Sequence, residues 1–223
     1  MHRSVRFIRS KAETYKIDPE RIGITGGSAG GHLSLMQGTA GTAGKADAKD
    51  PVEKFSSRVQ AVACFYPPTD FLNYGAPGVC GVGMGPLAPL QVAFGPQALT
   101  ADGRETLGRE ISPIYYVTKT LPPTLIIHGD KDEVVPLQQA QSFQEKARAA
   151  RYDLLLAHAH EIGAEAIALA HHADDQIETF LMKLMRGSGL KGLRGMGEDS
   201  PCWYDQSIRL LRPLLKTTRY QLE

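Results

Sequence analysis

The first half of the chain alternates between helical and extended hydrophobic patterns. An apolar residue recurs every three or four positions over residues 2–16, which predicts a helix. Short apolar runs with β-branched residues over 21–26, 59–66 and 124–128 predict three strands. A second helical pattern, over residues 29–38, follows the first of these strands directly.

The pattern changes at Leu137. No glycine or proline occurs from there until Gly163, and apolar residues recur at helical spacing, which favours one long helix that ends at Gly163. The alternative is a strand over residues 152–156, with His160 in the loop after it. A short apolar run over residues 166–170 then predicts a buried strand, and residues 174–186 predict a further helix.

Strands that alternate with helices predict an α/β fold, with a parallel sheet covered by helices on both faces. In this arrangement residues 166–170 supply the last strand of the sheet. Residues 73–110 are rich in glycine and proline, which is typical of a lid or binding loop. Residues 187–223 are rich in glycine at first and basic later, and we expect a loop and a weakly ordered tail.

Composition narrows the function classes. A chain of 223 residues, 42% of them hydrophobic, can bury a real core, and a formal net charge of +1 predicts neither a nucleic-acid partner nor a membrane partner. Three widely spaced cysteines favour reduced thiols. The sequence has no run of about 18 apolar residues and no visible signal peptide, so we expect a cytoplasmic protein.

Candidate chemistry begins at Ser28. It is the serine of a Gly-x-Ser-x-Gly run between the first strand and the helix after it, surrounded by Gly26, Gly27, Ala29 and Gly30. This order predicts a nucleophile elbow, a tight turn that lifts a serine hydroxyl clear of a parallel sheet. The glycines alone would also suit an ordinary strand–helix turn or a phosphate-binding loop, but the spacings of the Rossmann and P-loop motifs are absent.

A serine nucleophile needs a histidine base that a carboxylate orients. The segment after the third strand contains Asp130 and Asp132, and the strand end places them at the same sheet edge as Ser28. We assign the acid to Asp132, with Asp130 as the alternate. A polar turn that caps the following helix would explain the same residues.

Residues 1–147 resemble the α/β-hydrolase family of esterases and lipases, near the bacterial acetyl-ester and xylan esterases. Three segments carry the resemblance: residues 17–22, 26–33 and 122–136. It implies carboxylic ester hydrolysis, with Ser28 as nucleophile, Asp132 as triad acid and the Ala29 amide as one oxyanion donor. The family's first strands and its His-Gly-Gly oxyanion loop would precede Met1, and a second copy of the chain could cover the sheet edge so exposed, as a homo-oligomer.

Residues 148–223 resemble a different family, the tRNA(Ile)-lysidine synthetases, which are nucleotide-binding ligases. The matching runs are residues 167–179 and 184–193. That family binds ATP with a Ser-Gly-Gly-x-Asp-Ser loop, which this sequence lacks, so lysidine synthesis is not expected. The chain is therefore interpreted as an esterase domain over 1–147 fused to a synthetase fragment over 148–223.

The base must then come from the C-terminal segment. We expect His172 or His171, because they follow the strand over residues 166–170, and His160 under the alternative reading. Otherwise these histidines and the neighbouring aspartates are a structural relic or a metal cluster. The sequence predicts a serine carboxylesterase for short-chain acyl esters that acts through an acyl-enzyme, without cofactor or metal. The alternatives are a catalytically weak or inactive fusion protein and, less favoured, a nucleotide-binding ligase fragment.

Overall fold

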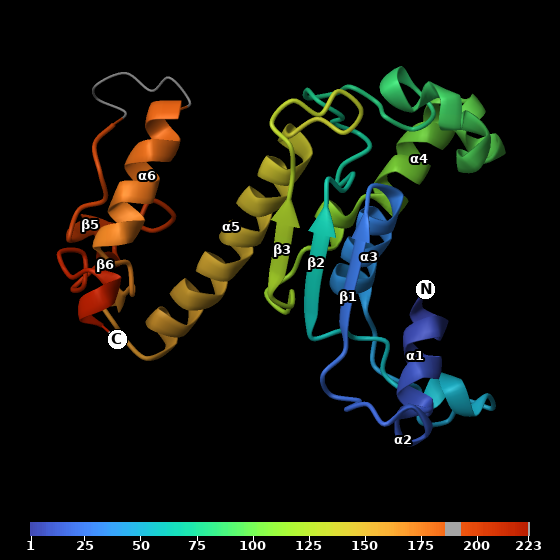
Figure 1. The fold of residues 1–223 in the computed structure, drawn as a ribbon, viewed down its shortest axis with the longest axis horizontal. Helices are drawn as coiled ribbons and strands as arrows, with labels where there is room; N and C mark the ends of the chain where they lie inside the picture. The colour runs from blue at the N-terminus through green and yellow to red at the C-terminus, as the bar shows by residue number, and fades with distance from the viewer. Residues whose placement is uncertain (186–192, 223) are drawn as a thin grey trace. The chain divides into compact units, whose positions relative to one another are not determined.

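The three apolar runs of the first half pair as one parallel sheet. In the computed structural model, which describes residues 1–185 and 193–222, the strands are β1 (Gly23–Gly27), β2 (Ala61–Phe65) and β3 (Thr124–Ile127). They lie in the order β1-β2-β3, with Gly27 opposite Phe65 and Phe65 opposite Ile127 (Figure 1). The prediction of an α/β fold with a parallel sheet is confirmed.

Helices cover one face of this sheet. Helix α3 (Ala29–Ala40) lies behind the strands in Figure 1, and its Leu35 packs in a core with Val62 and Cys64 of β2. Phe143, from helix α5 (Gln138–Glu161), packs into the same core. This core holds β1 and β3 at fixed register, and so it positions the loops at their carboxyl ends.

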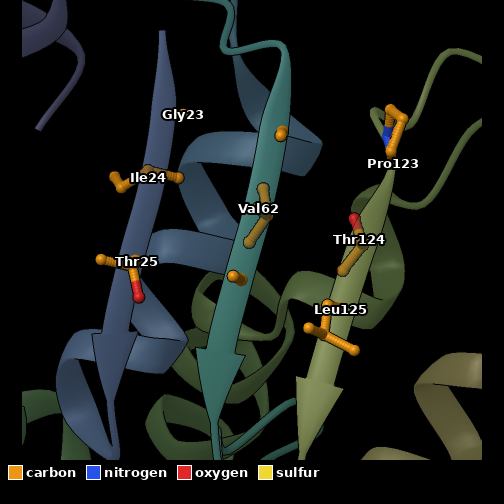
Figure 2. A pocket seen from close by; sticks show the side chains of 9 residues that line it. Gly23, Ile24, Thr25, Val62, Pro123, Thr124 and Leu125 are labelled. Atoms are coloured by element: carbon orange, nitrogen blue, oxygen red, sulfur yellow. The ribbon is translucent and has the colours of Figure 1, made fainter.

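On the opposite face of the sheet, no helix of residues 1–150 covers the strand side chains. Phe65, Leu125 and Ile127 are 40%, 57% and 49% exposed, because alternate residues of each strand point away from α3. A shallow depression of about 550 Å³ lies across the strand starts on this sheet (Figure 2). Within residues 1–150 the helices pack on one face of this sheet, whereas helices on both faces were expected.

The glycine- and proline-rich segment over residues 73–110 is ordered. It contains short 3₁₀ helices and α4 (Ala101–Ile111), packed on a core of Phe71, Tyr74, Val82, Leu87 and Ala98. The other helices of the first 150 residues are α1 (His2–Ser10), α2 (Ala12–Tyr15), η1 (Pro51–Lys54), η2 (Gly85–Phe94), η3 (Pro96–Leu99) and η4 (Pro113–Tyr116).

The chain divides into two units, residues 1–150 and 151–223, and α5 runs through the junction. The second unit has its own sheet, in the order β4-β6-β5, from β4 (Ala166–Ala168), β5 (Asp199–Pro201) and β6 (Arg209–Leu211). Strand β4 pairs in parallel with β6, not with a strand of the first sheet. The prediction that residues 166–170 complete the first sheet is wrong.

The tail after residue 192 is also more ordered than expected. Besides β5 and β6, it contains the short helix η5 (Arg219–Gln221), and Cys202, Ile208 and Leu210 are buried against Tyr152 and Leu156 of α5. Helix α6 (Ala173–Met185) follows β4. The expected end of this helix at residue 186 and part of the 184–193 motif lie outside the described residues.

The long helix α5 settles the choice between the two patterns considered for residues 137–163. Residues 152–156 are helical, so the alternative strand is wrong, and His160 lies on the helix instead of in a loop. Gly163 ends the helix with φ +69° and donates its N–H to the His160 carbonyl, as the sequence predicts. Within residues 1–185 and 193–222, no helix has the length and apolar character needed to cross a membrane.

Candidate active site

Ser28 occupies the tight turn between β1 and α3. Its backbone has φ 52° and ψ −119°, a region that non-glycine residues rarely adopt. Its N–H donates to the Phe65 carbonyl of β2 at 3.0 Å, which continues the sheet ladder one residue past the strand. The side chain is exposed. A strained, exposed serine at a strand–helix turn is the geometry of a nucleophile elbow.

Two neighbouring glycines permit this turn by close approach. A Cβ at Gly26 would lie 2.4 Å from the Gly30 carbonyl oxygen, so β1 and α3 could not meet with a side chain there. A Cβ at Gly27 would lie 3.1 Å from the Tyr66 hydroxyl. Gly30 itself has open space around its Cβ position, so its role in the motif is not steric.

Ala29 is the first residue of α3, directly after Ser28. The N–H groups of a helix's first turn have no acceptor within the helix, and they point toward the helix start. The Ala29 N–H therefore has the placement that an oxyanion donor beside Ser28 requires.

Asp132 lies in the loop after β3, where the sequence placed it. Its Oδ1 accepts the backbone N–H groups of Val134 and Val135, both at 2.9 Å, which fixes the carboxylate and leaves Oδ2 for another partner. His128 Nε2 lies 3.8 Å from that Oδ2 and makes its own hydrogen bond with the Val135 carbonyl at 2.7 Å. The alternate, Asp130, is exposed in the same loop.

Tyr74, in the segment over residues 73–110, holds the loop of Asp132 in place. The sequence did not predict this contact. Its hydroxyl donates to the Val134 carbonyl at 3.0 Å, and the side chain is buried. Burial, and then the negative charge of Asp132, raises the pKa of the Tyr74 hydroxyl. The phenol therefore stays neutral and remains a donor beside the acid.

Parallel pairing places Ser28 and the Asp132 loop at the same sheet edge. The Ser28 N–H bonds to Phe65, and the next residue of that segment, Tyr66, donates its N–H to the Ile127 carbonyl at 2.7 Å. These two bonds join the carboxyl ends of all three strands. The geometry thus brings Ser28 and the loop of Asp132 to one edge of the sheet in residues 1–150.

His171 and His172 follow β4 in the second unit. The backbone N–H of His172 donates to Asp175 at 2.8 Å, and its Nδ1 lies 3.5 Å from carboxylate oxygens of both Asp174 and Asp175. Asp174 also accepts the N–H of Arg219 at 2.7 Å. His172 and the two aspartates therefore organise the start of α6.

His160 also has a carboxylate partner in its own unit. Its Nε2 lies 2.7 Å from Asp205 Oδ2. The hydroxyl and N–H of Ser207, followed by His160, lower the pKa of Asp205 to about 2, so this carboxylate is ionised at neutral pH. In the part of the chain that the structure describes, no three His, Cys, Asp or Glu side chains converge as a metal site.

Two family comparisons match different parts of the chain. Residues 1–147 match the BD-FAE family, and residues 116–223 match the PP-loop domain family. An alignment of 86 residues is 48% identical to tRNA(Ile)-lysidine synthase from Novosphingobium aromaticivorans, covering 39% of this chain and 26% of that protein. These matches confirm the sequence interpretation of an esterase-like part fused to a synthetase-like part.

The esterase-like part has curated and structural relatives. It is 34% identical over 146 residues to a probable carboxylic ester hydrolase, LipM, from Mycobacterium tuberculosis, covering 66% of this chain and 32% of LipM. A truncated carbohydrate esterase from gut microbiota superposes with TM-score 0.52 and 30% identity, covering 66% of this chain and 53% of that one.

An acetyl ester-xyloside bifunctional hydrolase from Caldicellulosiruptor lactoaceticus is similar over the same share of this chain. It superposes with TM-score 0.52 and 27% identity, and 49% of it is covered. Since coverage of the relatives described here runs from 26% to 53%, the chain spans only part of each.

Proposed function

Residues 1–147 place this chain in the BD-FAE family, and from that premise we propose that the protein is a serine carboxylesterase for short-chain acyl esters. The observation that carries the proposal is the strained backbone of Ser28 at the β1–α3 turn, φ 52°. Curated relatives named as esterase or carboxylic ester hydrolase support the ester-cleaving class. The proposal also specifies the substrate: esters whose acyl group is short.

In the proposed mechanism the Ser28 hydroxyl attacks the ester carbonyl carbon. A histidine accepts the hydroxyl proton and then delivers it to the departing alcohol, which leaves an acyl-enzyme. Water activated by the same histidine releases the acid. The Ala29 N–H donates to the oxyanion that develops on the carbonyl oxygen, and Asp132 orients the histidine. No step needs a cofactor or a metal.

The general base is proposed to be His172 or His171, with His160 as the alternate. Each of the three is changed to glutamine singly, and hydrolysis of p-nitrophenyl acetate is followed from pH 5 to 9. The base variant loses turnover by orders of magnitude, while the other two retain it. Loss in none of the three would remove the C-terminal histidines from the mechanism.

The test of the esterase function uses Ser28→Ala. Removing the nucleophile should lower kcat for p-nitrophenyl acetate by about 10³-fold or more. Ser4→Ala, an exposed serine on α1, is the matched control and should hydrolyse at the wild-type rate. Equal turnover by Ser28→Ala and wild type would refute the proposal.

A second candidate function is an inactive fusion protein with an esterase-like frame. It is favoured by one observation: His172 and His160 already have carboxylate partners within the second unit. A fluorophosphonate probe separates the candidates, because only a competent serine is labelled. Nucleotide binding by the PP-loop-like part is tested by ATP titration, in which we expect no binding.

The proposed oligomeric state is a homo-oligomer formed through a sheet edge. Strands β1 and β3 are the outer strands of the first sheet, so each has one side without a neighbouring strand in that sheet. Light scattering during size exclusion should report a mass of at least twice the 24.2 kDa of one chain. A monomer at micromolar concentration would contradict it.

A further inference from the structure

Tyr66 is strained and exposed at the centre of the candidate site. It directly follows β2 and has φ 38°, which is rare for a bulky residue. The side chain is 43% exposed. Core burial therefore does not explain why the chain tolerates this conformation, and strained residues without that explanation concentrate at functional sites.

The backbone of this segment is held from both sides. The Tyr66 N–H donates to Ile127 of β3 at 2.7 Å, and the preceding carbonyl, that of Phe65, accepts the Ser28 N–H at 3.0 Å. Tyr66 thus lies between the elbow and the strand that leads to Asp132. Both bonds engage the peptide group between Phe65 and Tyr66, and one of them is made by the Ser28 N–H.

The phenol ring lies beside the elbow. A Cβ built on Gly27 would be 3.1 Å from the Tyr66 hydroxyl oxygen and 3.3 Å from its Cζ atom. The ring tip therefore occupies the space that a side chain at Gly27 would fill. Gly27 is the residue before Ser28, so the ring tip lies next to the elbow.

We propose that Tyr66 is a specificity-determining residue whose ring limits the size of the acyl group beside Ser28. The inference rests on the proposed esterase function and deepens it. An acetyl group fits beside the ring, whereas a long acyl chain meets it. The ring of Tyr66, which has a left-handed backbone, lies next to Gly27.

The first test measures acyl selectivity. Tyr66→Gly removes the ring and relieves the backbone strain, Tyr66→Ala removes only the ring, and Tyr66→Phe keeps the bulk. In both ring-less variants the ratio of kcat/KM for p-nitrophenyl hexanoate to that for p-nitrophenyl acetate should rise at least about tenfold. Tyr66→Phe and the remote control Tyr15→Ala, a half-exposed tyrosine on α2, should keep the wild-type ratio.

A purely structural role predicts something different. Both esters would then lose rate equally in Tyr66→Ala, and Tyr66→Gly would recover it by relieving strain. An unchanged hexanoate-to-acetate ratio in the two ring-less variants therefore overturns the proposal.

The second test needs no turnover, so it separates this proposal from the esterase function itself. In a Ser28→Cys background, alkylation of position 28 by N-ethylmaleimide and by the bulkier N-(1-pyrenyl)maleimide is timed by peptide mass spectrometry. Adding Tyr66→Gly should raise the pyrenyl-to-ethyl rate ratio at least fivefold. If the wild-type chain hydrolyses no ester, the pyrenyl-to-ethyl rate ratio alone tests the role of Tyr66. An unchanged ratio then overturns the proposal.

Discussion

Gly26 and Gly30 lie four residues apart in the same motif, but they have different surroundings. A Cβ at Gly26 would meet the backbone of Gly30 at 2.4 Å, and backbone cannot move aside as a flexible side chain can. Gly30 lies in the first turn of α3 and has open space at its Cβ position. Alanine at Gly26 therefore measures the cost of a steric clash, whereas alanine at Gly30 measures helix propensity.

Gly26→Ala should lower the free energy of unfolding by about 1–3 kcal/mol, the usual cost of forcing atoms into a packed contact. Gly30→Ala should be neutral or stabilise by up to about 1 kcal/mol, because alanine favours the helix. Urea denaturation followed by circular dichroism measures both. Equal destabilisation by the two substitutions would show that the contact at Gly26 has been misjudged.

Single substitutions distinguish the proposed role of Asp132 from that of Asp130. Asp132→Asn keeps an oxygen that can accept the Val134 and Val135 N–H groups, so the loop should persist while the negative charge is lost. Esterase kcat should fall by about 10⁴-fold, as for a triad acid. Asp130→Asn, with its exposed side chain, should retain wild-type turnover. The reverse ranking would assign the acid to Asp130.

At the scale of elements, helix α3 carries a histidine that responds to pH. His32 Nε2 bonds the Ile111 carbonyl at 2.6 Å, and its ring stands edge-on to Phe71 at 5.3 Å between centroids. Burial lowers the pKa of His32 below its ordinary value of 6.5, although the hydrogen bond to Ile111 opposes this shift. Below that pH, the unfolded chain binds a proton at His32 more readily than the folded chain does.

The stability of the wild type should therefore fall as the pH drops below about 6.5, because protons then favour the unfolded state. His32→Gln keeps an amide donor for Ile111 but does not titrate, so its urea midpoint should change less between pH 7.5 and 5.5. The difference between the two proteins isolates His32 from the other titrating groups. An identical change in both would contradict the burial argument.

Local pattern predicted the elements of this chain better than their assembly. The glycines around Ser28 and the unbroken helical spacing up to Gly163 predicted the elbow and α5, because each is fixed by nearby backbone sterics. Strand β6 was missed because it has only three residues, too few for a period to show. The left-handed conformation of Tyr66 was missed because no local sequence pattern marks it.

Pairing between strands depends on long-range partners that periodicity does not encode. The apolar run at residues 166–170 suits any parallel sheet, and in the structure β6 is its partner. The exposed face of the first sheet in residues 1–150 was missed for a similar reason: the apolar run of β2 predicts a buried strand without saying what covers each side. The positions of Ser28 and Asp132 at strand ends were predictable, whereas the partners of the histidines were not.

At the scale of the whole molecule, the chain has separate cores in its two units. Leu35 is fully buried in the core of the first sheet, and Leu210 is fully buried with Cys202 and Ile208 in the second unit. Leu35→Ala and Leu210→Ala should each cost about 2–5 kcal/mol. Hydrogen exchange should show amide protection lost mainly in residues 1–150 for the first and in residues 151–223 for the second. Equal loss in both units for either variant would contradict separate cores.

Ser28 is expected to be an activated nucleophile, and covalent labelling measures this reactivity without any substrate. The full-length protein is treated with a fluorophosphonate and digested, and the modified peptide is identified by mass spectrometry, with Ser28→Ala and Ser4→Ala in parallel. We expect a single phosphonylated residue, Ser28, in the wild type and in Ser4→Ala, and no labelling in Ser28→Ala. Labelling that persists in Ser28→Ala, or a wild type that is not labelled, would contradict it.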